Sequence, residues 1–294
     1  MSGFKEILVC SDATENIEAT LETALLAARR FNSHIDAVHI HKEPTCVLPV
    51  PVVTSDMAGF VVNDVVTAEE TALAETADKT RRIFEKFIEK EDIRPQAEPD
   101  LNSNEVTAEF RELYGSADEI LSWASRVSDL TVLPRPDTEA LSEDAFEMMN
   151  AVLMESGSAV LVSPLTAPVS LGNRIAVAWD ASEEAAKAVT FALPFLKRAE
   201  EVVLMETAAP NPELAGVDFL KKRLMRHGVS ASVLIIPETS SVSALGDELI
   251  RQTCGHFDML VMGAYTQSNM RRWILGSTTK YMVENADIPL LMAH

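Results

Sequence analysis

The chain has 294 residues, 47% of them hydrophobic and 24% charged, which is a globular composition with room for two domains of about 150 residues. Its formal net charge of −20 disfavours general binding to nucleic acid or to an anionic membrane, because such a surface repels phosphate groups. No signal-peptide pattern or membrane-length apolar run is present, and the three widely spaced cysteines fit a reducing compartment, so a cytoplasmic location is expected.

The sequence repeats itself once. The run 7–14 (ILVCSDAT) returns 168 residues later as 175–182 (IAVAWDAS), and the run 129–132 (DLTV) returns 129 residues later as 258–261 (DMLV). The first copy therefore carries 39 additional residues in its middle. The segment 163–172, with two prolines and a final glycine, separates the copies. These features predict domains at 1–164 and 173–294, joined by a linker at 165–172.

The elements of both copies alternate between strands and helices. The first copy opens on a strand near 7–10, continues through a loop at 44–59 and a long helix near 64–91, and closes on a strand at 159–162. The second copy has strands near 174–179, 201–206, 231–236, 258–263 and 288–292, and helices near 183–198, 213–227, 241–254 and 276–286. This alternation predicts an α/β fold of two tandem doubly wound domains, each with a five-stranded parallel sheet.

The segment 263–280 (GAYTQSNMRRWILGSTTK) is the part of the second copy best suited to bind an anion. A core strand ends at Gly263, a loop with two arginines follows, and a helix begins at Gly276 and Ser277. A helix N-terminus offers unpaired N–H groups and a partial positive charge to a phosphate. Gly276 allows close approach of the backbone, and the hydroxyls of Ser277 and Thr278 can donate hydrogen bonds. Ligands of open α/β sheets bind at this edge, beyond the carboxyl ends of the strands.

The spacing of Gly263, Gly276 and Ser277 resembles the nucleotide motif of the universal stress protein family, G-x2-G-x9-G-[ST]. The resemblance covers essentially the whole chain and implies a tandem member with Rossmann-like domains of the adenine nucleotide alpha hydrolase type. It places Asp180 on the adenine side of a nucleotide. It assigns the ribose and phosphate contacts to Gly263, Thr266, Gly276, Ser277 and Thr278. The sequence departs from the motif at Thr266, which replaces its second glycine, and a β-branched residue is costly where positive φ is needed.

The first copy lacks this apparatus. The run 134–137 (PRPD) stands where 263–266 (GAYT) stands in the second copy. The equivalent helix begins with Glu143 and Asp144, whose carboxylates satisfy the helix dipole themselves and repel phosphate. Asp12, the counterpart of Asp180, is interpreted as structural. The sequence therefore predicts one nucleotide site for each chain, in the second copy.

Three functions remain open at this point. The first is a stress-response or regulatory protein that binds ATP or another adenine nucleotide, with or without Mg²⁺, and does not turn it over efficiently. The second is a ligand-free interaction or scaffold protein, without any cofactor, in which Thr266 closes the site. The third is a slow ATPase, which ranks last because no catalytic base is visible, so no catalytic residue is assigned. His39 and His41 share one face of a strand without a third ligand, so no metal site is assigned.

The resemblance also implies how the domains assemble. Members of the family pair their domains through the last strands, here 160–162 and 290–292, which would make the chain an intramolecular pseudo-dimer. A homodimer of whole chains and an unidentified regulatory protein partner both stay open. Nucleic acid and membranes are not expected as partners.

Overall fold

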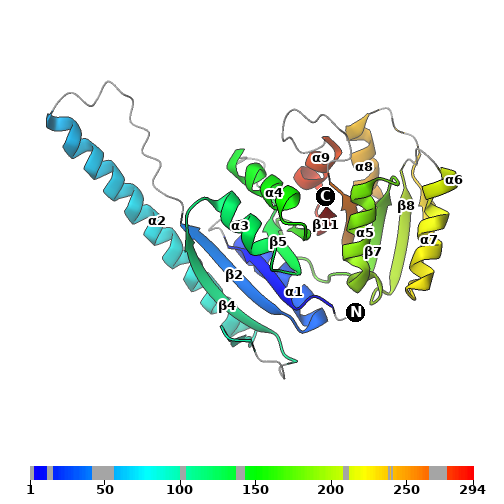
Figure 1. Cartoon of the computed structure of the whole chain (residues 1–294), viewed down its shortest axis with the longest axis horizontal. Coiled ribbons are helices and arrows are strands. Elements are labelled where there is room, and N and C mark those ends of the chain that lie inside the picture. The colour runs from blue at the N-terminus through cyan, green and yellow to red at the C-terminus, as the bar shows by residue number, and fades with distance from the viewer. Residues whose placement is uncertain are drawn as a thin grey trace.

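The structure is a computed structural model that describes residues 3–11, 16–41, 56–99, 104–136, 143–207, 212–237, 239, 241–264 and 277–294. The strands are β1 (Glu6–Cys10), β2 (His34–His41), β3 (Arg94–Pro95), β4 (Thr107–Tyr114), β5 (Leu130–Pro134), β6 (Ala159–Ser163), β7 (Arg174–Trp179), β8 (Glu201–Glu206), β9 (Ser232–Ile235), β10 (Met259–Gly263) and β11 (Leu290–Ala293). The helices are α1 (Ile17–Phe31), α2 (Asp56–Lys90), α3 (Ala117–Ser125), α4 (Glu143–Glu155), α5 (Glu183–Leu196), α6 (Pro212–Ala215), α7 (Val217–Arg226), α8 (Val242–Thr253) and α9 (Ser277–Asn285). Strands and helices alternate, as the α/β prediction requires (Figure 1).

The strands form one eleven-stranded sheet in the order β3-β4-β2-β1-β5-β6-β11-β10-β7-β8-β9. Neighbouring strands run parallel except at the centre, where β6 and β11 are antiparallel and pair Val162 with Leu290 and Val160 with Met292. We call the chain through β6 the first half and the chain from β7 the second half. The two halves therefore join through their final strands, which confirms the pairing expected from the sequence (Figure 1).

The strand register reproduces the sequence repeat. Ile7 of β1 pairs with Leu130 of β5, and Ile175 of β7 pairs with Met259 of β10, so both offsets found in the sequence describe the same spatial neighbours. The second half contains the five parallel strands that were expected. The first half adds a sixth, the two-residue β3, at its outer edge. This addition follows α2, in the longer middle region of the first copy.

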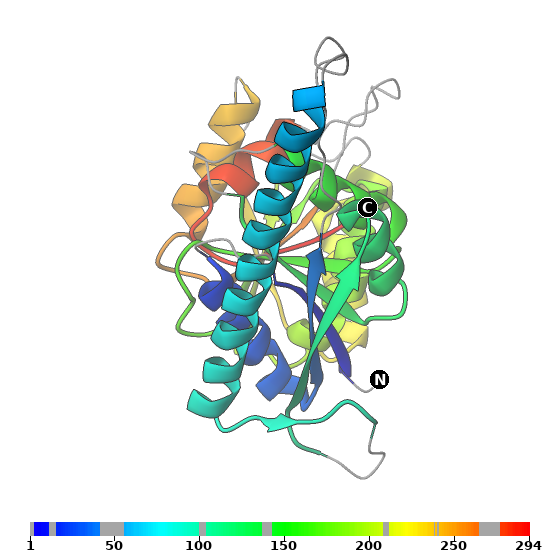
Figure 2. The same ribbon diagram turned by 90° about the vertical axis from the view of Figure 1, so that its left-hand side faces the viewer.

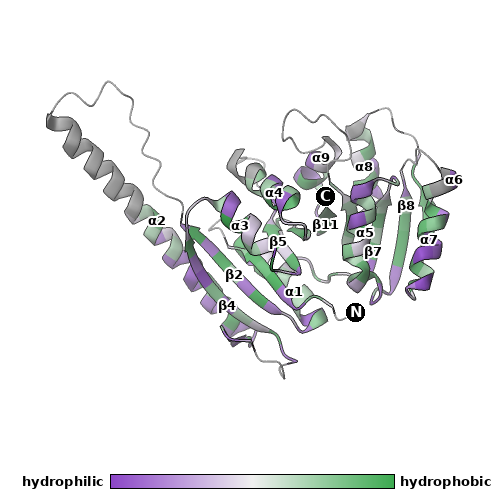
Figure 3. Ribbon diagram, in the orientation of Figure 1, coloured by the Kyte–Doolittle hydropathy of each residue, from purple (hydrophilic) through white to green (hydrophobic). Residues whose placement is uncertain are grey.

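Two hydrophobic cores lie on opposite faces of the sheet. One core contains alternate strand residues such as Ile7 and Val261, and helices α1, α2, α5 and α7 contribute Leu21, Phe84, Leu193 and Leu220. The other contains Leu8 and Leu260, and helices α3, α4, α8 and α9 contribute Leu121, Met149, Leu249 and Met282. Burial on both faces explains the nearly continuous apolar strands, which are green in Figure 3.

Helix α2 begins earlier than the sequence analysis expected. A loop was predicted as far as Gly59, but the helix already starts at Asp56 and runs for 35 residues. Glycine inside a helix costs only about 1 kcal/mol relative to alanine, so it need not end one. Figure 2 shows α2 lying along the sheet and continuing past its end. No helix in the described part of the chain is long and apolar enough to cross a membrane.

The helix predicted at 213–227 is two helices. Gly216 adopts an extended conformation (φ −63°, ψ 166°) and caps α7, so α6 ends at Ala215 and α7 starts at Val217. Glycine is a favourable residue at a helix N-cap, which explains the break. The carboxylate of Glu206, at the end of β8, accepts the Val217 N–H at 3.1 Å and satisfies one free donor of α7.

Candidate functional site

The carboxyl edge of the second half contains the end of β7 and the start of α5. Asp180 follows β7 directly, is partly buried, and its Oδ1 accepts the backbone N–H of Ser182 at 3.0 Å. Ala181, between them, has a left-handed conformation with φ 61°. The Ser182 hydroxyl in turn accepts the Ala185 N–H at 3.1 Å and caps α5. Asp180 therefore stabilises the turn that leads into α5. This structural role is separate from the nucleotide contact that the resemblance implies.

Gly263 ends β10, next to β7, and lies against the first turn of α5. A Cβ atom at this position would come within 2.6 Å of the Ala185 amide nitrogen and 2.9 Å of the Glu184 Cβ atom. Both distances are too short for real contacts, so the close approach of α5 requires glycine here. The packing of α5 thus explains a glycine at this position of the motif without any ligand.

The first half has a different residue at this position. Its β5 ends at Pro134, the counterpart of Gly263. Helix α1 begins at Ile17, whose counterpart is Ala185, two residues inside α5. The first half thus combines a proline at the strand end with a helix that starts two residues later than α5. Asp12 lies outside the described residues.

The other side of the candidate site is the N-terminus of α9. This helix follows the loop that leaves β10, and its first turn contains no acidic residue, whereas α4 in the first half begins with Glu143 and Asp144. Thr278 is partly buried in this first turn. Thr266 and Gly276 lie outside the described residues, and the side chain of Ser277 is likewise not described.

Two further side chains, those of His294 and Glu184, lie at this edge. His294 follows β11, with its Nδ1 atom 3.4 Å from the Ala264 carbonyl oxygen and 4.0 Å from a carboxylate oxygen of Glu184. Glu184 belongs to the turn of α5 that covers Gly263. No local sequence pattern marks either residue, because strand pairing across about 110 positions brings them together.

The two histidines of β2 have partners within the protein. The Nδ1 atom of His39 lies 3.1 Å from the Ser11 carbonyl oxygen, and the Nε2 atom of His41 lies 3.3 Å from a carboxylate oxygen of Glu112. The ring of His41 also stacks on Tyr114, with centroids 4.4 Å apart. Among the described residues, no group of three or more His, Cys, Asp or Glu side chains could hold a metal ion.

Part of the chain matches a known protein family in sequence. The model of the universal stress protein family matches residues 255–294, which span β10, α9 and β11. No curated protein matches the chain. A crystal structure of a universal stress protein from Archaeoglobus fulgidus superposes with a TM-score of 0.60 at 15% identity, covering 97% of this chain and 96% of that one.

Two structures from Pseudomonas aeruginosa are also similar. A putative universal stress protein has a TM-score of 0.55 at 14% identity, covering 99% of this chain and 93% of its own. A functionally unknown protein has a TM-score of 0.54 at 14% identity, covering 99% and 92%. The chain thus matches the universal stress protein family in sequence over residues 255–294 and has the fold of universal stress proteins over nearly its whole length.

Proposed function

We propose that this chain is a regulatory protein of the stress response that binds ATP or another adenine nucleotide in its second half, without efficient turnover. The observation that carries the proposal is the start of α9, at the carboxyl edge of the sheet, with no acidic residue in its first turn. In a chain of net charge −20, a helix N-terminus free of carboxylates is a favourable place for a polyphosphate. The match of the family model to residues 255–294 supports the same segment.

The position of Asp180 supports an adenosine group on the other side of the edge. Among the described residues only its Oδ1 atom is hydrogen-bonded, to Ser182, so Oδ2 is available to a ribose hydroxyl or an adenine amino group. β7, which precedes Asp180, is the direct neighbour of β10, which precedes the phosphate loop. A single nucleotide could therefore span Asp180 and α9. In this proposal the domains keep the boundaries 1–164 and 173–294.

A ligand-free scaffold is the second candidate, and two contacts favour it. Asp180 already has a structural partner in Ser182, and the backbone of Glu184 and Ala185 in the first turn of α5 packs against Gly263. If Thr266 also crowds the site, the second half would keep only its structural role, as the first half does. Purified protein separates the candidates directly: heat denaturation followed by chromatography of the supernatant should release about one adenine nucleotide per chain if the site is functional.

Removing the Ser277 hydroxyl should weaken ATP binding about fivefold, or about 1 kcal/mol, because a charge-assisted hydrogen bond to phosphate is lost. Titration calorimetry of Ser277→Ala measures this change and should give one site per chain. The control is Ser116→Ala, which removes the serine hydroxyl at the start of α3 in the first half and should leave the affinity unchanged. Equal losses in the two variants, or two equal sites, would contradict a site confined to the second half.

Replacing Thr266 with glycine should tighten ATP binding by about 1–2 kcal/mol if the site is functional, because a branched Cβ atom is removed where the family motif has glycine. The same calorimetric titration detects the change. The scaffold candidate predicts a different result, since a closed site gains nothing from this substitution. If neither the wild type nor Thr266→Gly binds ATP, the proposal of nucleotide binding is wrong and the interaction role remains.

A further inference from the structure

The two helices that border the candidate site both end against the first half of the chain. Helix α9 ends at Asn285, and the guanidinium of Arg135 donates to the carbonyl oxygens of Glu284 and, at 2.7 Å, Ala286. It also lies 3.2 Å from a carboxylate oxygen of Asp287. The Arg135 side chain is only 8% exposed. The last carbonyl groups of a helix have no partner within the helix, so Arg135 satisfies acceptors that would otherwise remain unpaired.

Arg30 makes a similar contact with the end of α5. From α1 in the first half, its guanidinium donates to the carbonyl oxygens of Arg198 at 2.5 Å and Gly172 at 2.7 Å, and to the Asn173 side chain at 2.8 Å. Arg198 lies two residues beyond Leu196, the last residue of α5. Both arginines thus place a positive charge at the negative end of a helix dipole in the second half.

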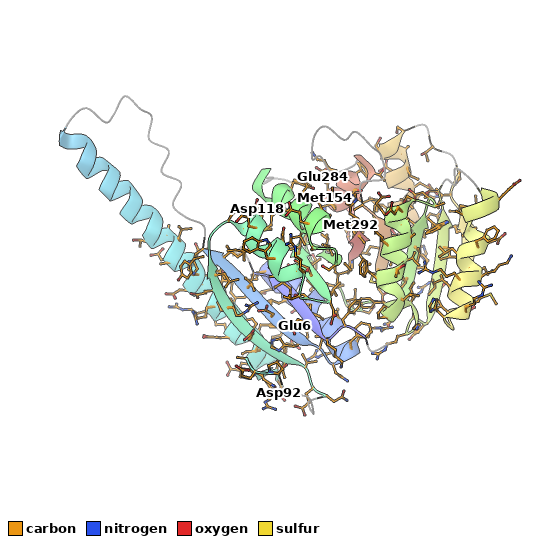
Figure 4. All side chains as sticks on the ribbon, viewed as in Figure 1. Glu6, Asp92, Asp118, Met154, Glu284 and Met292 are labelled. Carbon is orange, nitrogen blue, oxygen red and sulfur yellow. The ribbon has the colours of Figure 1, made fainter. Side chains whose placement is uncertain are left out.

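Helix α5 has a second, apolar attachment. Phe195 packs on Phe31 and Phe4, with ring centroids 4.9 Å and 5.4 Å away, and the Arg198 guanidinium lies 4.7 Å from the centre of the Phe31 ring. This aromatic cluster fixes the end of α5 even without Arg30. The end of α9, where Glu284 lies at the junction of the halves (Figure 4), packs Met282 and Val283 into the hydrophobic core. Arg135 adds hydrogen bonds from the first half to the backbone of this helix end.

The Arg135 contact is not reciprocal. Its counterpart in the second half is Ala264, which has no side chain that could reach the first half, although both backbone amides bond alike, to Ser163 and Ala293. Arg135 belongs to the run 134–137, which replaces the phosphate loop in the first half. The first half lacks the phosphate loop. From the equivalent position it supplies Arg135, whose side chain binds the end of α9 in the second half.

We infer that Arg135 is a positioning residue for the nucleotide site of the second half, acting through α9. A helix of nine residues is about 14 Å long and moves as one body, so freedom at its carboxyl end displaces the N–H groups at its start. Phosphate binding needs these donors to converge on one point. The inference rests on the proposed function for its ligand, but the anchoring of α9 is independent of it.

The test compares Arg135→Met, Arg135→Lys and a matched control, Arg126→Met. Arg126 also places a guanidinium on a helix end, with its Nε atom 3.1 Å from the Glu155 carbonyl oxygen, but α4 belongs to the first half. Titration with ATP, at a temperature where all variants are folded, should show at least tenfold weaker binding for Arg135→Met. Arg135→Lys should lie between this variant and the wild type, because one ammonium cannot replace a forked donor. Arg126→Met should bind as the wild type does.

Hydrogen exchange of α9 gives a second readout that does not need a ligand. The amides of residues 281–285 bond back to residues 277–281, so a loosened α9 should exchange them faster in Arg135→Met and not in Arg126→Met. Unchanged exchange in Arg135→Met, or wild-type affinity for ATP in that variant, would overturn the inference. If the wild type binds no ATP while exchange rises only in the Arg135 variants, the proposed function fails and the anchoring of α9 stands.

Discussion

Replacing Asp258 with alanine should lower the free energy of unfolding by about 3 kcal/mol. Its Oδ1 atom accepts the Arg174 N–H at 2.9 Å, and its Oδ2 atom accepts the Asn173 N–H at 3.0 Å and the Ser170 hydroxyl at 2.7 Å. These contacts join the start of β7 and the segment before it to the start of β10. Hydrogen bonds to a charged group contribute about 1.5–3 kcal/mol each, and alanine leaves two backbone donors without their acceptor.

Urea denaturation of Asp258→Ala measures the loss, and Asp258→Asn gives the matched comparison. Asparagine keeps one carbonyl acceptor but not the charge or the second acceptor, so its loss should be intermediate. A change below about 0.5 kcal/mol for alanine would show that the contacts contribute nothing net. The first half repeats the device: Oδ2 of Asp129 accepts the N–H groups of Lys5 at 2.6 Å and Glu6 at 3.0 Å. This shared contact explains why both copies have an aspartate directly before the strand that follows α3 or α8.

The large-scale fold could be predicted because it depends on patterns that survive in the sequence. The two offsets between the copies fix which strands are equivalent, and the resemblance predicted the pairing of the last strands that Leu290 and Val162 confirm. Local boundaries were less predictable, since Gly59 does not break α2 and Gly216 does divide the helix after β8. Glycine permits a break without requiring one, and tertiary packing decides between the two outcomes. The domain boundaries stay a prediction.

The candidate site was only partly predictable for a related reason. The sequence identified Asp180 and Gly263, and the structure adds that the turn to Ser182 and the first turn of α5 need them. The role of Arg135 could not be read from the sequence, because its carbonyl partners lie about 150 positions away in another half. In the sequence, the run 134–137 shows only the loss of a phosphate loop.

The other large effect concerns Glu6, at the start of β1 (Figure 4). Burial first, and then the nearby carboxylates of Asp36, Glu109 and Asp129, raise the pKa of Glu6 from 4.5 to about 7, against the opposing effect of Arg111. A carboxyl whose pKa is higher in the folded state binds its proton more tightly there. Its contribution to stability is therefore complete below about pH 4.5 and is lost as the pH rises through 7.

Glu6→Gln should consequently raise the free energy of unfolding by about 2 kcal/mol at pH 8.5 and change it little at pH 4.5. The full linkage value for this pKa shift is about 3 kcal/mol, and partial solvent exposure of the side chain reduces it. Urea denaturation at the two pH values measures the difference. His34 nearby, whose pKa is lowered by burial, titrates in both proteins, so its effect cancels in the comparison.

Glu112→Gln, on β4, is the control with the opposite sign. Burial alone would raise the pKa of Glu112, but hydrogen bonds from Arg81 and His41 outweigh it and hold that pKa below 4.5. A lowered pKa stabilises the protein above the unfolded value, so this variant should lose stability at pH 8.5, where Glu6→Gln gains it. If both variants shift the free energy of unfolding in the same direction at pH 8.5, ionisation does not determine the sign. The raised pKa of Glu6 would then not explain the effect of Glu6→Gln.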